Sequence, residues 1–289
     1  VTQNGNKVTV AKNGEVTCEI TNTRDLAKLA VVKKVDGGAS VPADWKLSAI
    51  AAAPNAGKNI VDRAGNITTL AEVYAGTEYT LSEDGPGNYT ASNWVCTGTG
   101  VTQNGNKVTV AKNGEVTCEI TNTRDLAQLK LVKQVEGKNN PDDWTLTAKA
   151  AAPDDGLDIS TPGGSGQFED VYAGSEYTLA ETGPGGYTPS EWVCLPAGDV
   201  PDQVTAADLQ EALNNGDTIT LEKGQKVTCT IINTRDLGSL KITKVFDPKA
   251  SGYAKAFDID YKCGDDPKQT VQVKAGESVD GRIINTTSP

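Results

Sequence analysis

The feature that most constrains the fold of this chain is repetition. Residues 1–27 recur without change at residues 101–127. Other stretches recur more loosely, so that "DWKLSAIAAAP" returns as "DWTLTAKAAAP" and "AEVYAGTEYTLSEDGPGNY" as "EDVYAGSEYTLAETGPGGY". Repetition on this scale indicates a tandem array of similar folded units rather than one large core.

The register of the repeats predicts where each unit begins and ends. We expect residues 1–27 to be the C-terminal strands of a preceding repeat, and residues 28–125 and 128–236 to be two complete repeats. Residues 239–289 then form the start of a third, truncated repeat. Its final stretch, "KAGESVDGRIINTTSP", is either a middle segment or a shortened last strand.

Within each unit, short segments of alternating polarity are separated by Gly, Pro, Asn and Asp. This pattern predicts an all-β fold of tandem Ig-like β-sandwiches. One insertion, near residues 205–215, has the pattern of a short helix. Thr205 can cap it, Leu209 and Leu213 are four residues apart, and Gly216 can close it. We interpret this helix as a surface decoration, with a partner-binding role as the alternative.

The composition excludes several classes of function. The chain has a formal net charge of −11 and no histidine. Without histidine there is no Ser-His-Asp or Cys-His catalysis, and the commonest zinc ligand is missing. The negative charge argues against nucleic acid, and no apolar run is long enough for membrane insertion. We therefore expect no metal, no cofactor and no turnover enzyme.

The six cysteines form no Cys-x-x-Cys pair, which favours structural disulfides and an oxidising, extracellular location. Cysteines and tryptophans share the inward face of two strands, at Trp94 with Cys96 and at Trp192 with Cys194. We expect one disulfide in each complete repeat: Cys96–Cys118 and Cys194–Cys229. Buried free thiols are the alternative, and Cys18 and Cys263 are left without a predicted partner.

Charged and polar residues stand in the apolar phase of several predicted strands. In "LKLVKQVEG", Lys133 shares a face with Leu129 and Leu131, because side chains alternate along a strand. The same pattern places a lysine, a glutamate and an asparagine on three strands of each complete repeat. These residues are Lys33, Glu83 and Asn122 in the first repeat, and Lys133, Glu181 and Asn233 in the second.

A buried ion pair would account for the lysine and the glutamate, but it leaves the asparagine unexplained. Burial favours the neutral amine of lysine, which is a nucleophile, and the protonated acid of glutamate. The amine can then attack the asparagine carboxamide, with loss of ammonia, while the glutamate polarises the carbonyl and moves protons. The product is a Lys–Asn amide formed once, which is self-processing and not enzymatic turnover.

These residues resemble a known family. A lysine on the first strand, "YTLAETGPGGY" in the middle and "IINT" at the end look like the CnaB-type domains of Gram-positive adhesins and pilins. The resemblance implies a transthyretin-like sandwich with an internal isopeptide bond, promoted by Glu83 and Glu181. In the third repeat Lys244 fits the lysine position, no glutamate matches, and Asn285 is a candidate partner. Residues 1–27 lack the first strand of their repeat, which would carry the lysine that matches Asn22, so we expect Asn22 to be unreacted unless another chain supplies one.

These observations favour a structural function. We expect a stalk or fibre segment of a bacterial surface adhesin or pilus-like protein, located outside the cell at the surface or cell wall. Its expected partners are neighbouring repeats, copies of itself joined head to tail, and a host or surface ligand. The alternative is a ligand-binding adhesive module that uses loops or the inserted helix of the second repeat. An enzyme acting on external substrates is the weakest of the three hypotheses.

Overall fold

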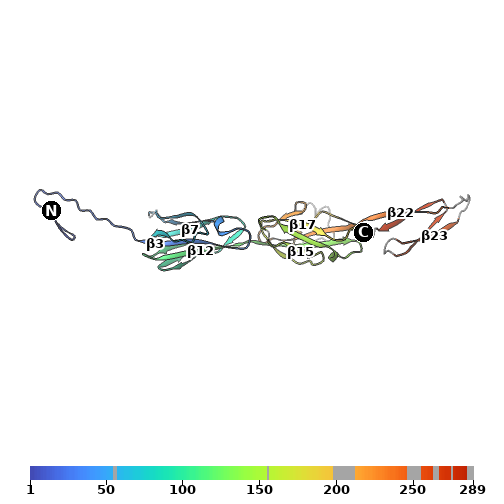
Figure 1. Ribbon diagram of the computed structural model, residues 1–289, viewed down its shortest axis with the longest axis horizontal. Coiled ribbons are helices and arrows are strands. Elements are labelled where there is room, and N and C mark those ends of the chain that lie inside the picture. Colours follow the sequence, from blue (N-terminus) through green and yellow to red (C-terminus); the bar gives the residue numbers. More distant parts are fainter. Residues whose placement is uncertain are drawn as a thin grey trace. The chain divides into compact units, whose positions relative to one another are not determined.

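The structure is a computed structural model of the 289-residue chain. It describes residues 1–54, 57–154, 156–197, 212–245, 255–262, 267–274 and 276–284, with side chains up to residue 279. The chain divides into two compact units (Figure 1). The first comprises residues 1–35, 41–86 and 91–122, and the second comprises residues 36–40, 87–90 and 123–289.

The first complete repeat folds as a β-sandwich of two sheets. Its strands are β3 (Leu26–Asp36), β4 (Lys46–Ala51), β5 (Ile60–Ala64), β6 (Ala71–Tyr74), β7 (Glu78–Asp84), β8 (Tyr89–Ala91), β9 (Val95–Gly98), β10 (Val101–Asn104), β11 (Lys107–Val110) and β12 (Glu115–Arg124). One sheet has the order β10-β11-β7-β4-β5. The other has the order β6-β3-β12-β8, with β9 also paired to β12. A short 3-10 turn, η1 (Pro42–Asp44), leads into β4.

The second complete repeat is also a sandwich of two sheets, one of which has four strands where the first repeat has five. Its strands are β13 (Leu126–Glu136), β14 (Thr145–Ala150), β15 (Ile159–Pro162), β16 (Glu169–Tyr172), β17 (Glu176–Thr182), β18 (Tyr187–Pro189), β19 (Val193–Pro196), β20 (Thr218–Thr220) and β21 (Lys226–Arg235), with the turn η2 (Pro141–Asp143) before β14. The sheets are β15-β14-β17-β20 and β16-β13-β21-β18, with β19 also paired to β21. The prediction of tandem all-β sandwiches is therefore confirmed.

The first and last strands of the second repeat are parallel neighbours. Residues Gln128 to Glu136 of β13 pair in order with Lys226 to Thr234 of β21. The two chain ends of the repeat therefore leave from opposite ends of one strand pair. This pairing also places the lysine strand and the asparagine strand side by side in one sheet, with the glutamate strand β17 in the facing sheet.

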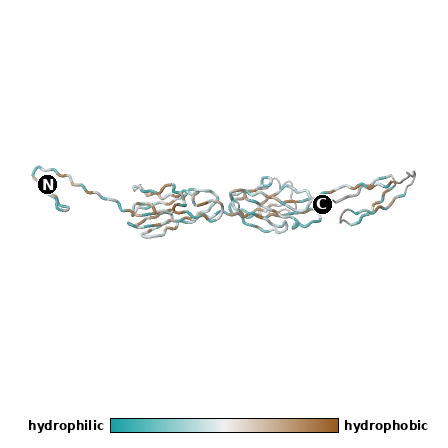
Figure 2. Tube along the Cα trace, viewed as in Figure 1, coloured by the Kyte–Doolittle hydropathy of each residue, from teal (hydrophilic) through white to brown (hydrophobic). Residues whose placement is uncertain are grey.

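The core of each sandwich follows from the alternating pattern of its strands. In the second repeat, Leu129 and Leu131 of β13 and Tyr177 and Leu179 of β17 are all buried in one hydrophobic cluster. Figure 2 shows hydrophobic and hydrophilic residues interleaved along the strands. Each strand thus contributes its apolar face to the space between the sheets and its polar face to solvent.

The duplicated segment at residues 1–27 folds differently from its copy. It forms a hairpin of β1 (Thr2–Asn4) and β2 (Lys7–Thr9), but residues 10–25 contain no strand and are exposed. The identical residues 101–127 supply β10, β11 and β12, which pair with other strands of the first sandwich. The sequence alone does not make residues 15–24 a strand, because a strand needs partners for its backbone groups.

Beyond the second sandwich, the described residues form two strand pairs. These pairs join β22 (Leu237–Thr243) to β25 (Ser278–Ile284) and β23 (Ala256–Tyr261) to β24 (Gln269–Lys274), both antiparallel. The pairing of β22 with β25 therefore differs from the parallel pairing of first and last strands in the second repeat.

The helix predicted near residues 205–215 lies mostly outside the described residues. Its described end, residues 212–215, is not helical, so the prediction is wrong there. The reason is hydrogen bonding to a strand that is distant in the sequence. The backbone N–H of Leu213 donates to the carbonyl oxygen of Cys194 (2.8 Å), and the Asn214 side chain is held by the same strand. These backbone groups are therefore engaged with β19 instead of with a helical turn.

Candidate functional site

In the second repeat the predicted lysine, glutamate and asparagine meet between the two sheets. The amine Nζ of Lys133 donates a short hydrogen bond to Oε2 of Glu181. The side-chain nitrogen Nδ2 of Asn233 donates to the other oxygen, Oε1, of the same carboxylate (2.8 Å). One carboxylate thus holds the amine and the carboxamide next to each other.

The first repeat has the same ion pair. The Nζ of Lys33 lies 2.5 Å from Oε2 of Glu83. Glu83 is therefore the carboxylate that faces the lysine, as the sequence predicts. Asn122 is 4% exposed, so it is buried at the position that corresponds to Asn233.

Strand register brings the asparagine to the lysine. In β13 and β21, Lys133 pairs with Ile231, and Asn233 lies two residues further along, opposite Val135. Residues two apart on a strand face the same side of the sheet, so Lys133 and Asn233 are diagonal neighbours on the inner face. The pattern in which every second residue is apolar therefore fixes both side chains toward the core.

The environment of the lysine amines is nearly dry. The side chains of Lys33 and Lys133 are 0% exposed, while those of Glu83 and Glu181 are 16% and 14% exposed. Burial lowers the pKa of both lysine amines, and the hydrogen bond and charge of the paired glutamate oppose that effect only in part. A lowered pKa raises the share of neutral amine, which is the form that can act as a nucleophile.

A tryptophan covers each amine. The Nζ of Lys33 lies 4.9 Å from the ring centre of Trp45, and the Nζ of Lys133 lies 5.2 Å from that of Trp144. Trp45 and Trp144 are 1% and 2% exposed. Sequence reasoning did not predict that these tryptophans cover the site, although their repeated position after an Asp in "DWKL" and "DWTL" was a usable signal.

Glycines allow the lysine and the tryptophan to lie this close to the backbone. A Cβ atom at Gly163 would lie 2.5 Å from the Cβ of Lys133, and one at Gly183 would lie 2.3 Å from Cδ1 of Trp144. Gly65 and Gly85 have the same places in the first repeat. Sequence reasoning missed these glycines, since glycine is common in turns and nothing distinguishes a packing glycine from a turn glycine.

The carboxamides carry an unpaired atom. Oδ1 of Asn122 and Oδ1 of Asn233 are buried and accept no hydrogen bond. A buried polar atom without a partner destabilises a fold by roughly 1–3 kcal/mol. Native structures rarely leave such atoms unpaired, so the carboxamide oxygens are unusual features of these two sites.

Each complete repeat also contains the disulfide that the sequence predicts. Cys96 bonds to Cys118, which lies directly opposite it across β9 and β12. Cys194 bonds to Cys229 across β19 and β21 in the same way. The loop-entropy model assigns about 3–4 kcal/mol of stabilisation to disulfides that close loops of these lengths.

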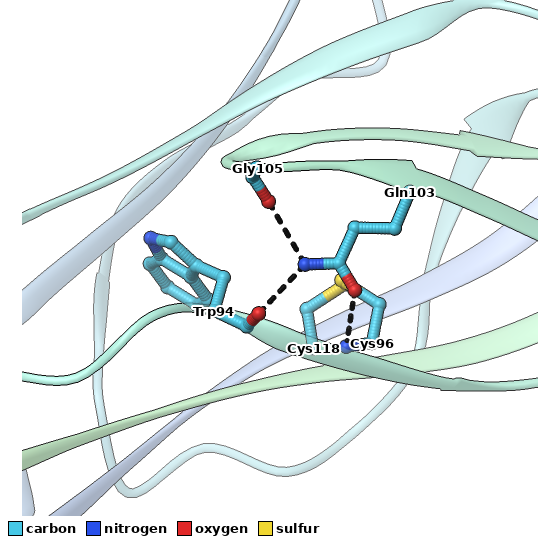
Figure 3. Close-up of a disulfide and its surroundings, with 5 residues drawn as sticks. All are labelled: Trp94, Cys96, Gln103, Gly105 and Cys118. Atoms are coloured by element: carbon cyan, nitrogen blue, oxygen red, sulfur yellow. Dashed lines mark hydrogen bonds between the residues drawn. A yellow bond between two sulfur atoms is a disulfide. The ribbon is translucent and has the colours of Figure 1, made fainter.

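A side-chain amide holds the strand of each disulfide in place (Figure 3). Nε2 of Gln103 donates to the carbonyl oxygens of Trp94 (2.7 Å) and Gly105 (2.8 Å), and its Oε1 accepts from the backbone N–H of Cys96 (2.9 Å). In the second repeat Asn214 makes the corresponding bonds around Trp192 and Cys194. The sequence signal was an amide residue two positions before a glycine, in "QNG" and "NNG".

The structure describes only some of the remaining predicted residues. Lys244 is half-buried, with its Nζ 5.1 Å from the ring centre of Phe257. Its candidate partner Asn285 lies outside the described residues, as does Cys263. Asn22 is exposed, and Cys18 is an exposed free thiol.

Two other findings bear on the kind of site. Within the described ranges, no group of three or more Cys, Asp or Glu side chains is arranged to hold a metal ion. In that same part of the chain, no helix has the length and apolar character that crossing a bilayer requires.

Two tandem β-sandwiches, in which the first and last strands are neighbours in one sheet, define a class of repeat domain. A family model described as the SpaA_2 prealbumin-like fold domain matches residues 24–120 and again residues 124–231. The chain belongs to this prealbumin-like fold family, and it contains two copies of the domain.

Solved structures with detectable similarity share little sequence with the chain. The Bacillus anthracis TIE protein is 14% identical with a TM-score of 0.48, and the match covers 90% of this chain and 43% of that one. A C-terminal fragment of the pilus adhesin SpaC from Lactobacillus rhamnosus GG is 16% identical with a TM-score of 0.43, covering 74% and 98%. The major pilin T-13 of Streptococcus pyogenes is 14% identical with a TM-score of 0.34, covering 75% and 98%. No curated protein sequence matches the chain.

Proposed function

We propose that the chain is a load-bearing segment of a bacterial surface fibre, such as a pilus or adhesin stalk, with CnaB-type domains closed by Lys–Asn isopeptide bonds. The observation that carries this proposal is the shared carboxylate of Glu181, which holds the Lys133 amine and the Asn233 carboxamide at its two oxygens. Membership of the prealbumin-like family and the names of the similar pilins and adhesins support the extracellular setting. The repeats near 28–125 and 128–236 are the proposed domains.

The bond forms without any outside reagent. The neutral Nζ of Lys133 attacks Cγ of Asn233, a C–N bond forms, and the bond from Cγ to Nδ2 breaks. Glu181 takes a proton from the attacking amine and gives one to the departing nitrogen, which leaves as ammonia. If the carboxamide of Asn233 rotates so that Oδ1 and Nδ2 exchange places, the unpaired Oδ1 points at Glu181. The protonated form of Glu181 can then donate a hydrogen bond to Oδ1 and polarise the carbonyl.

The proposed bond changes how the domain carries force. Because β13 and β21 are parallel neighbours, tension on the two ends of the domain shears one strand along the other. An amide between Lys133 and Asn233 carries that tension directly from the first strand to the last. It also closes a loop of about a hundred residues, for which the loop-entropy model gives about 4.7 kcal/mol.

Intact mass tests the proposal. We expect the purified chain to weigh less than its sequence by two ammonias, after correction for disulfide hydrogens. Replacing Lys33 by Ala should restore one ammonia, and replacing Lys133 by Ala should restore the other. The matched control is Lys34→Ala, because Lys34 is the neighbouring lysine but is 63% exposed and paired with Glu119. A wild-type mass without ammonia loss would refute the cross-link.

A ligand-binding adhesive role remains the second hypothesis from the sequence. Its main candidate, the inserted segment of the second repeat, falls largely on residues 198–211, which lie outside the described residues. We therefore build the proposal on the Lys–Glu–Asn clusters alone.

A further inference from the structure

The arginine of the "NTRD" motif is a buried charge that the proposed cross-link does not use. Arg124 is the last residue of β12, but it falls within the second compact unit, which contains residues 123–289. It is only 5% exposed. A guanidinium keeps its charge in proteins, so its burial requires charged and polar partners.

The second unit supplies partners for both Nη nitrogens, while Nε is buried without one. Nη2 of Arg124 donates to Oδ2 of Asp154 (2.9 Å) and to Oγ of Ser175 (2.8 Å), and Nη1 donates to the carbonyl oxygen of Asn88 (2.9 Å). The hydroxyl of Ser175 donates in turn to Oδ2 of Asp154 (2.7 Å). The guanidinium carbon lies 5.5 Å from the ring centre of Tyr172.

The carboxylate in this cluster is charged at neutral pH. Burial raises the pKa of Asp154, but hydrogen bonds from Ser175 and Arg124 more than offset burial, and the net shift is downward. The cluster therefore offers a negative charge, a hydroxyl and an aromatic face, which together suit a planar guanidinium better than a lysine ammonium.

The first unit contains part of the same arrangement. Nη2 of Arg24 donates to Oγ1 of Thr77 (2.8 Å), and its guanidinium carbon lies 3.9 Å from the ring centre of Tyr74. The position of Asp154 in "AAPDDG" is taken in the first repeat by Asn55 of "AAPNAG". The first unit thus has the aromatic ring and the hydroxyl but no aligned carboxylate, and Arg24 is exposed.

We propose that Tyr172, Ser175 and Asp154 form an arginine-binding socket, whose occupant is the arginine that ends the last strand of the preceding repeat. The socket fixes the linker at residues 124–126 to the second unit. It also shields the peptide bond after Arg124 from proteases. The socket is a property of the "VYAGS" segment and of Asp154, and it does not depend on the isopeptide bonds.

Trypsin tests the socket with a control built into the chain. Trypsin cleaves after arginine, and Arg24 and Arg124 stand in the identical sequence "EITNTRDLA", so the local preference of the protease is the same at both. We expect limited digestion of the full chain to release residues 1–24 early and to leave the bond after Arg124 intact, as read from fragment masses.

Opening the socket should expose the protected bond. We expect Asp154→Ala to speed cleavage after Arg124 by roughly tenfold or more. Loss of a hydrogen bond to a charged group changes the equilibrium between closed and open socket by about that factor. Cleavage after Arg24 should not change. The control is Glu191→Ala, which removes an exposed carboxylate of the same unit.

A second variant keeps the test decisive if Asp154→Ala fails to fold. Arg124→Lys leaves the socket residues in place and still presents a tryptic site, but lysine lacks the planar fork that bonds Asp154 and Ser175 together. Faster cleavage after Lys at position 124 supports the socket. Equal cleavage after Arg24 and Arg124 in the wild type, or no acceleration in either variant, would overturn it.

Discussion

Lys33 and Lys133 show how a β-sandwich can keep an amine away from water. Each amine has a glutamate on one side and a tryptophan ring nearby, and its side chain is fully buried. Its alkyl stem lies against a glycine that has no side chain to exclude it. Such an arrangement lowers the pKa of the amine, and the glutamate still pairs with the amine when it is charged. The proposed self-reaction needs both effects, because the neutral amine is the nucleophile and an unpaired buried charge would destabilise the fold.

The role of the glutamate can be tested in the first repeat, where two carboxylates are adjacent. We expect Glu83→Gln to block the first cross-link, because an amide in that place cannot transfer protons between the amine and the leaving nitrogen. After correction for the mass of the substitution itself, the intact mass should then be higher than that of the wild type by one ammonia.

Asp84→Asn is the matched control, since Asp84 is the next residue along β7 and is exposed. Its mass should show both ammonia losses. Retention of both losses in Glu83→Gln would show that the carboxylate is not needed for the reaction.

Among the elements, β12 shows what a sequence can and cannot specify. The alternation in "VTCEITN" predicted a strand with Cys118, Ile120 and Asn122 inward, and that prediction is confirmed in β12. The same letters at residues 16–22 form no strand. Sequence periodicity predicts which face a strand will bury, but pairing with neighbouring strands decides whether the strand exists.

Hydrogen exchange measured by NMR tests this difference between identical segments. We expect backbone amides of residues 116–122 to exchange at least about a hundredfold more slowly than those of residues 16–22, because only the former are hydrogen-bonded within a sheet. Chemical composition and neighbours are the same in both segments, so intrinsic exchange rates cancel. Equal protection would mean that residues 16–22 find a strand partner in solution.

The candidate site was predictable in part for the same physical reasons. The lysine, glutamate and asparagine of each repeat were identified because they lie on the apolar face of their strands. A polar residue on that face is buried, and its burial calls for a physical explanation. The close approach at Gly163 and the position of Trp144 over the amine depend on how two sheets pack, and alternation along one strand carries no information about that. The prediction of a helix near 205–215 was wrong at its described end, because the side chain of Asn214 makes hydrogen bonds to a strand that is distant in the sequence.

For the molecule as a whole, the proposed bonds predict a mechanical response. We expect single chains pulled from their ends, with disulfides reduced, to show no unfolding length from residues 133–233. In Lys133→Ala the same region should extend by about 350 Å, since about a hundred residues are released at about 3.5 Å each.

The wild-type chain measured in the same experiment is the reference, and Lys34→Ala again serves as the control. Both should resist extension in the two complete repeats. Release of the full length from the second repeat of the wild type would contradict the proposed force path, even if the chain were otherwise stably folded.

The order of the strands also governs when a domain can mature. The amine lies on β13, the first strand of its domain, and the carboxamide lies on β21, the last. The two cannot meet until every residue between them has been delivered to the same compartment. Until then no isopeptide bond joins the two strands, so the extended polypeptide can pass through a narrow export channel. After the proposed reaction, the domain contains a covalently closed loop that denaturant alone cannot open.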